Sequence, residues 1–205
     1  MRKGRGILVI AAWVLCVPDA ALAGGPGVSA GVTRTTLTAT GWSAAAGFDV
    51  GLFATIATFK GISLQPEIRY VRKVPERRIG DGAATILSAL TLDFVEVPVV
   101  LRVPLRRERR LTPVVFAGIY AACRVRARSR IEIGESSYEE DLADATRRWH
   151  SGVLAGAGLE VRGGPVTWLT EARYSQGLTA VGTHEGTNDW STRTVTVLAG
   201  VAWGH

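Results

Sequence analysis

Charged side chains of both signs lie within segments that otherwise alternate between apolar and polar residues. Glu171 and Arg173 are two positions apart in the segment TWLTEARYSQGLTAV, and Glu67 and Arg69 have the same spacing. A carboxylate and a guanidinium at positions i and i+2 of a strand project from the same face, where they can form a charge-assisted hydrogen bond. Such a pair serves either acid–base chemistry or structural bracing, and we interpret it as bracing.

The histidines and serines do not form a pattern typical of catalysis. His150, His184 and His205 are too far apart in the sequence to indicate a metal site. Ser151 follows His150 directly, so the two would face opposite sides of a strand, whereas a serine hydrolase needs serine, histidine and an acid to converge. We therefore expect no catalytic residue, no metal site and no cofactor.

An acidic cluster lies within residues 127–148: Glu135, Glu139, Glu140, Asp141 and Asp144. Carboxylate oxygens are calcium ligands, but their spacing here does not match a calcium-binding loop. We expect a solvated acidic loop that could include a short helical turn.

The N-terminal residues 1–23 have the layout of a secretory signal peptide. Basic residues precede an apolar run at 7–17, and the small residues Ala21 and Ala23 stand at the positions that a signal peptidase requires. The run is too short to cross a bilayer as a helix. We therefore expect export, with residues 24–205 forming a single domain.

Several features of the remaining chain predict an all-β fold. The sequence has 24 glycines, and no later apolar stretch is long enough for a transmembrane helix. After removal of the leader, Cys123 is the single cysteine, so no internal disulfide can form. Eight segments alternate in the manner of strands: 28–38, 46–57, 61–72, 91–103, 112–126, 149–162, 165–178 and 191–203.

The lengths of the strands and connectors predict a membrane barrel. Several strands reach 11 residues or more, whereas soluble strands most often have about five or six and membrane strands about 9–11. Short connectors (58–60, 104–111, 163–164) alternate with long ones (73–90, 127–148, 179–190). This alternation is typical of an up-and-down outer-membrane barrel, with both termini at the periplasmic end. The predicted fold is an eight-stranded antiparallel transmembrane β-barrel.

The two faces of the strands differ in composition. One face is rich in Val, Ala and Ile, which suits lipid contact. The other carries charges that we expect to point inward and neutralise one another: Glu67, Arg69, Glu96, Arg102, Arg124, Arg126, Glu160, Arg162, Glu171 and Arg173. Buried charges are costly unless they are paired, and eight strands enclose a lumen that side chains can fill. We therefore expect no general diffusion pore.

Two finer features follow from this arrangement. If Gly163-Gly164 is a two-residue hairpin turn, Gly156 lies opposite Glu171, and Gly158 opposite Leu169. Aromatic residues near the strand ends are expected in interfacial girdles: Trp42, Tyr70, Phe94, Trp149, Trp168, Tyr174, Trp190 and Trp203.

Five segments, in order along the chain, resemble the small PorT-like outer-membrane β-barrel family: ISLQPEIRYVRK, LDFVEVPVVLRV, TPVVFAGIYAACRV, GVLAGAGLEV and TEARYSQGLTAV. The resemblance extends over roughly residues 28–203. It implies an eight-stranded barrel that the outer-membrane assembly machinery inserts. The resemblance thus indicates where the protein is located, but it does not indicate a molecular activity.

From these patterns we expect a monomeric protein of the Gram-negative outer membrane with a structural, surface-interaction or assembly role. Its expected partners are outer-membrane lipid and lipopolysaccharide, and Arg72, Lys73, Arg77 and Arg78 could contact lipopolysaccharide phosphates. The alternative is that a wider basic cluster at the outer end forms ordinary charged loops paired with the acidic cluster. Its members are Arg72, Lys73, Arg77, Arg78, Arg124, Arg126, Arg128, Arg130, Arg147 and Arg148. Nucleic-acid binding does not fit an exported chain with a net charge of only +6.

Two other functions stay open from the sequence. An exported soluble β-barrel would place the Val/Ala face inside, around a small apolar ligand, and the charges outside. An outer-membrane lipid-modifying enzyme is the less favoured alternative.

Overall fold

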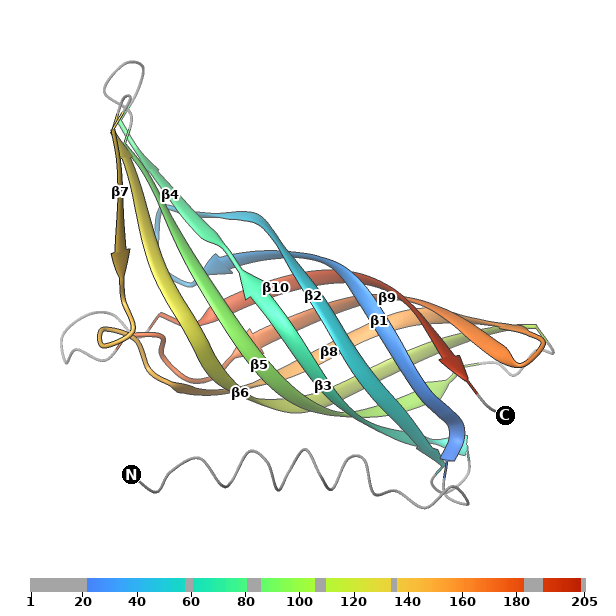
Figure 1. Cartoon of the computed structure of the whole chain (residues 1–205). Helices are drawn as coiled ribbons and strands as arrows, with labels where there is room; N and C mark the ends of the chain where they lie inside the picture. The colour runs from blue at the N-terminus through green and yellow to red at the C-terminus, as the bar shows by residue number, and fades with distance from the viewer. Residues whose placement is uncertain are drawn as a thin grey trace.

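The computed structural model describes residues 22–57, 61–80, 86–105, 110–133, 136–182 and 190–203, most of them in antiparallel strands (Figure 1). The strands are β1 (Leu22–Leu37), β2 (Trp42–Ala57), β3 (Ser63–Lys73), β4 (Pro75–Ile79), β5 (Ile86–Pro104), β6 (Leu111–Ile133), β7 (Ser136–Asp141), β8 (Trp149–Gly163), β9 (Val166–Gly177) and β10 (Thr192–Trp203). The expected signal peptide lies outside the described residues except for Leu22 and Ala23, with which β1 begins. No helix among the described residues has the length and apolarity to cross a membrane.

Eight of these strands close into a barrel in the order β1–β2–β3–β5–β6–β8–β9–β10, and β10 pairs back with β1. β4 continues β3 after a break at Val74 and pairs with the same two neighbours. β7 pairs only with β6. Closure leaves no open sheet edge along the wall, and the prediction of an eight-stranded antiparallel barrel is confirmed.

The barrel has two different ends. At the short-turn end lie the end of β5, the beginning of β6 and the turn between β8 and β9, together with the beginning of β1 and the end of β10 (Figure 1). At the opposite, long-loop end, β4, β5, β6 and β7 extend beyond the other strands (Figure 1). Much of the sequence expected to form the long loops 73–90 and 127–148 is therefore strand. The reason is that β5 and β6 continue to pair with each other as far as Ile86 and Ile133.

The acidic cluster belongs to this extension, and the expectation of an acidic loop was wrong for its central part. Ser136–Asp141 forms β7, whose residues are all exposed. Glu139 lies 3.6 Å from Arg128 and 3.5 Å from Arg130 on β6. The charged residues of the two strands are therefore neighbours across the sheet, as the charged-loop alternative expected. Glu135 lies outside the described residues.

The wall is apolar outside and polar inside. On β9 the outward Trp168 and Tyr174 are 59% and 46% exposed, whereas the inward Glu171 and Arg173 are 1% and 6% exposed. Val32, Leu52, Leu101 and Ile119 are among the outward residues that continue this apolar surface around the barrel, all more than half exposed. A soluble barrel with an apolar pocket would have the opposite arrangement, so this alternative does not agree with the structure.

A β-bulge in β6 changes which residues face the lumen. Asp93 pairs with Arg126 and Phe94 with Arg124, so Val125 has no partner on β5 and is 55% exposed. An extra residue reverses the alternation beyond it. Arg126 consequently faces outward, and Arg124 is not buried among the lumen charges. The expectation that both join the lumen network was wrong.

The hairpin between β8 and β9 has a two-residue turn, but one residue later than predicted. Gly163 pairs with Val166, so the turn is Gly164-Pro165, with φ +62° at Gly164. Glycine at the first turn position is typical of a type II′ turn. Gly156 therefore pairs with Arg173, and Gly158 with Glu171, which corrects the predicted register by two residues.

The aromatic residues divide into two groups. Trp149, Trp168, Tyr174 and Trp203 are exposed on the outer wall, as expected for girdles, and Tyr70 stacks on Phe48. Three other residues expected in the girdles pack inside the barrel instead: Trp42, Phe94 and Trp190.

Candidate functional site: the barrel interior

The central layer of the lumen contains an ion pair that crosses the barrel. Arg173 on β9 donates two hydrogen bonds to Glu67 on β3, from Nη1 to Oε2 at 2.7 Å and from Nη2 to Oε1 at 2.9 Å. In the ring of eight strands β3 and β9 are four places apart, so they stand on opposite sides. Glu67 is fully buried. The contact therefore ties together two strands that share no backbone hydrogen bond.

Further ion pairs extend this layer toward the neighbouring strands. Arg173 also binds Glu171, through Nη2 at 2.6 Å and Nε at 2.8 Å. Glu171 accepts a hydrogen bond from Arg102 on β5, and Arg102 donates a second bond to Glu160 on β8 at 2.9 Å. The planar guanidinium groups present several donors in a fixed geometry, so one arginine can serve two carboxylates.

On the β3 side, Arg69 is the centre of a second set of bonds. It donates to Glu67 at 3.0 Å, to Asp49 on β2 at 2.7 Å and to the Ser29 hydroxyl on β1 at 3.0 Å. Gln65 adds a hydrogen bond to Glu67 at 2.7 Å. Asp49 and Gln65 were missed as network members. Asp49 is two residues from the inward Gly51 on β2, and Gln65 is two residues from Glu67 on β3. This spacing indicates in the sequence that both side chains face inward.

Lys73 lies inside the barrel rather than at its surface. Its Nζ is 2.7 Å from Glu96, and its side chain is 3% exposed. The ammonium also lies 5.1 Å and 5.3 Å from the ring centroids of Phe94 and Tyr120. The expectation that Lys73 contacts lipopolysaccharide was wrong, because it shares the inward parity of Glu67 and Arg69 on β3.

The half of the lumen nearer the long-loop end holds an apolar plug. Its buried members include Leu90, Leu92, Phe94, Tyr120 and Leu154. The rings of Trp42 and Trp190 lie against it, with their centroids 6.2 Å apart. The sequence interpretation missed this plug because it treated the inward face as a ladder of charges. The even spacing of Leu92 and Phe94 from Glu96 indicates the same inward face.

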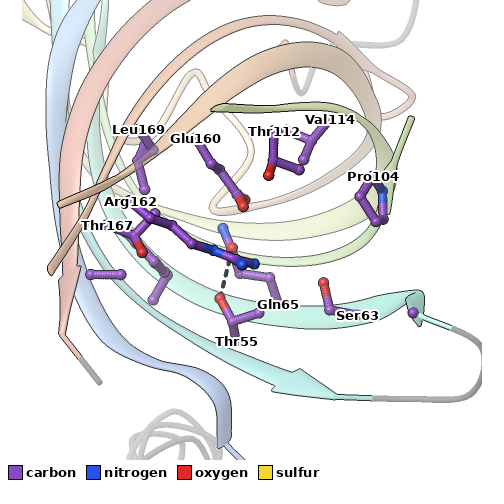
Figure 2. Close-up of a pocket in the computed structure, with 13 residues that line it drawn as sticks. Thr55, Ser63, Gln65, Pro104, Thr112, Val114, Glu160, Arg162, Thr167 and Leu169 are labelled. Carbon is purple, nitrogen blue, oxygen red and sulfur yellow. Dashed lines mark hydrogen bonds between the residues drawn. The ribbon is translucent and has the colours of Figure 1, made fainter. Parts of the chain in front are cut away.

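Near the short-turn end the lumen opens into a vestibule of about 310 Å³. Thr55 and Gln65 hydrogen-bond at 3.2 Å on one side of it, and the Arg162 side chain extends into it (Figure 2). Glu160 on β8 points into the same space (Figure 2). In the central layer the cavity beside Arg69 and Arg173 measures only about 20 Å³, which is room for about one water molecule.

The other predicted site residues lie outside the central network. Arg162 is exposed at the vestibule. Arg124 donates to the carbonyl oxygens of Ala143 at 2.6 Å and Arg147 at 3.2 Å, and it thereby holds the segment before β8. On the outer wall Arg72 forms a two-bond contact with Asp93, at 2.7 and 3.0 Å. Among the candidate phosphate contacts, Arg77 and Arg78 are exposed on β4.

The described residues do not form a metal-binding group, and His150 and Ser151 do not bond to each other. Within the described ranges no group of three or more His, Cys, Asp and Glu side chains could hold a metal ion. His150 bonds to the Arg147 carbonyl at 2.8 Å, and its ring lies edge-on to Phe94. The Ser151 hydroxyl lies 3.0 Å from that of Thr179. The His150 ring and the Ser151 hydroxyl thus have separate partners.

An eight-stranded antiparallel barrel with an apolar outer wall and a charged interior defines the class of integral outer-membrane β-barrel proteins. A family model described as "Outer membrane protein beta-barrel domain" matches residues 25–181. The chain belongs to this outer-membrane β-barrel family. Such proteins are located in the outer membrane.

Solved structures of small outer-membrane barrels are similar to this chain in fold. Neisserial surface protein A has 13% sequence identity and a TM-score of 0.51, and the match covers 88% of this chain and 97% of that one. Ail, the attachment invasion locus protein of Yersinia pestis, has 14% identity and a TM-score of 0.44, over 88% of this chain and 99% of Ail. No curated protein matches the sequence.

Proposed function

We propose that the protein is a monomeric, non-conducting outer-membrane barrel that serves as a rigid scaffold for its surface-exposed strands. The observation that carries this proposal is the Glu67–Arg173 pair, which occupies the centre of the lumen and joins opposite walls. The apolar plug lies on one side of it, and the cavity beside it has room for about one water molecule. A continuous water-filled path does not fit this filling.

The extension at the long-loop end supports a surface-interaction or assembly role. There β4–β7 present exposed charges of both signs, among them Arg77, Arg78, Arg128 and Glu139. Loops and extensions on a rigid scaffold are where binding residues concentrate in many folds. A role as a structural protein without enzymatic activity accounts for the interior, since its acid and base groups bind one another.

The finer identity is also a proposal. The order of the five sequence segments supports a place within the PorT-like group, and the layout of residues 1–23 supports export through a signal peptide in a Gram-negative cell. The barrel assembly machinery would then insert the chain, and outer-membrane lipid and lipopolysaccharide would surround it. Neither a cofactor nor nucleic acid has a place in this proposal.

Planar-bilayer recording of the refolded protein tests the closed lumen. We expect no stable conductance steps, while a general diffusion porin recorded in parallel shows them. Heat-modifiable migration on a gel confirms in the same sample that the barrel is folded. Stable steps from heat-modifiable protein would overturn the proposal.

A further inference from the structure

The outer wall has a groove across β9, β10, β1 and β2, close to the long-loop end. Its cavity measures about 640 Å³, and we name it the wall groove after six lining residues: Val32, Arg34, Tyr174, Arg193, Val195 and Val197. All six are exposed. They are outward-facing side chains of membrane-spanning strands, so whatever occupies the groove comes from the membrane.

The two arginines lie close enough to share one ligand. Arg34 on β1 pairs with Val195 on β10, and Arg193 is two residues from Val195 on the same face. Diagonal neighbours of this kind have backbones about 7–8 Å apart, within reach of long side chains. Two guanidinium groups can therefore converge on a single anion.

Neither arginine is neutralised by a carboxylate of the described residues. Arg193 uses its Nε for a 3.1 Å bond to Gln176, whose amide oxygen also accepts the Tyr174 hydroxyl at 3.0 Å. This uncharged partner orients Arg193 without cancelling its charge. Arg72, on another part of the same wall, differs because Asp93 binds it with two bonds. The wall groove thus has two positive charges without a neighbouring carboxylate among the described residues, whereas the charge of Arg72 is balanced by Asp93.

Below the arginines, toward the middle of the wall, the groove is apolar. Val32 pairs with Val197, and the two are 62% and 50% exposed. Tyr174 pairs with Val195 at the level of Arg34 and is an aromatic residue of the kind found at membrane interfaces. A ligand that suits both parts has an anionic head and an acyl chain.

We propose that the wall groove binds a lipid phosphomonoester of the outer leaflet, the chemistry of the phosphates of lipid A. The phosphate lies between Arg34 and Arg193, and an acyl chain covers Val32 and Val197. A phosphomonoester carries nearly two negative charges, roughly −1.5 to −2, which matches two arginines better than a singly charged phosphodiester. The site rests on the proposed lipid contact but places it on β1 and β10 rather than on β4.

Native mass spectrometry of the detergent-refolded barrel, titrated with diphosphorylated lipid A, tests the site. We expect Arg34→Gln/Arg193→Gln to weaken binding roughly tenfold or more, since hydrogen bonds between charged groups are the strong ones. Arg110→Gln/Arg162→Gln removes the same number of exposed charges at the opposite, short-turn end of the barrel. It is expected to change binding less than about twofold, as a distant surface charge does. Arg34→Lys/Arg193→Lys keeps the charges but loses the planar guanidinium groups that can donate two hydrogen bonds to one phosphate. Its affinity for lipid A should lie between those of the two glutamine variants.

Two further probes distinguish the possible sources of binding. Inorganic phosphate should not compete at the concentrations at which lipid A binds, and phosphatidylglycerol, a phosphodiester, should bind more weakly. Equal losses in both glutamine pairs, no loss in either, or equal affinity for phosphatidylglycerol would overturn the site. Heat-modifiable migration of each variant shows that its barrel is intact. Failure of the lipid site can therefore be distinguished from failure of the closed-lumen proposal, because the conductance recording tests the lumen separately.

Discussion

Glu67 and Arg173 are 106 residues apart in sequence and stand on opposite strands, yet both carboxylate oxygens of Glu67 bind guanidinium nitrogens of Arg173. The backbone hydrogen bonds of each barrel strand connect it only to its two neighbours. This contact fixes the distance between opposite walls, and Arg69 and Arg102 connect it to β1, β2, β5 and β8. The barrel is therefore braced across its interior as well as around its circumference.

Glu67→Gln should strongly destabilise the barrel. The substitution removes one negative charge between Arg173 and Arg69, both nearly fully buried, and leaves them incompletely compensated. Breaking a buried pair by changing one partner typically costs about 3–5 kcal/mol of unfolding free energy. Urea unfolding in detergent micelles, followed by gel mobility, measures the change.

Two variants serve as controls for Glu67→Gln. Glu139→Gln removes a carboxylate from an exposed pair on β7 and should have little effect, since exposed pairs contribute little. Glu67→Met/Arg173→Met removes both charges and should restore much of the lost stability. A Glu67→Gln protein as stable as the Glu139→Gln protein would mean that water hydrates the central layer.

High salt should leave the effect of Glu67→Gln unchanged. Exposed charges are screened over about 3 Å at 1 M ionic strength, whereas buried pairs are screened much less. The difference in unfolding free energy between wild type and Glu67→Gln, measured in 0.1 M and 1 M sodium chloride, should agree within error. A difference that shrinks markedly in 1 M salt would place the pair in contact with bulk solvent.

Gly156→Ala should destabilise the hairpin of β8 and β9. A Cβ at Gly156 would lie 2.3 Å from the Ala172 carbonyl oxygen and 2.5 Å from the Phe116 ring, so the backbone has to shift. Overpacking of this kind costs about 1–3 kcal/mol. Gly163→Ala, where a Cβ meets nothing within 4 Å, is the matched control for urea unfolding. Equal stability of the two variants would contradict the close contact of Gly156 with the Ala172 carbonyl oxygen and the Phe116 ring.

Arg124→Ala should loosen the segment before β8 without unfolding the barrel. The guanidinium binds the carbonyl oxygens of Ala143 and Arg147, and its removal leaves the His150 ring as the side-chain partner of the Arg147 oxygen. Limited trypsin digestion with mass spectrometry should show several-fold faster cleavage after Arg147, with unchanged urea unfolding. Arg126→Ala, an exposed neighbour, should leave the cleavage rate unchanged. Similar rates in both variants would show that these bonds do not hold the segment.

The sequence alone determined the architecture and the direction of each face. A strand repeats every two residues, so the alternation around Glu171 and Arg173 is visible locally, and long strands with alternating connectors indicate a membrane barrel. In such a barrel the apolar face meets lipid. For the same reason Glu67, Arg69, Glu96, Arg102, Glu171 and Arg173 could be placed inside before their partners were known.

The tertiary structure alone decided the partners and the exceptions. The extra residue Val125 in β6 turns Arg126 outward, and a turn one residue later than expected sets Gly156 opposite Arg173. Lys73 has the inward parity of Glu67, and the fold decides its partners there, which are Glu96 and two aromatic rings. The register, the bulges and the contacts across the lumen depend on closure of the whole ring of strands. The local alternation of residues shows that a charge faces inward, but it does not show which opposite strand carries its partner.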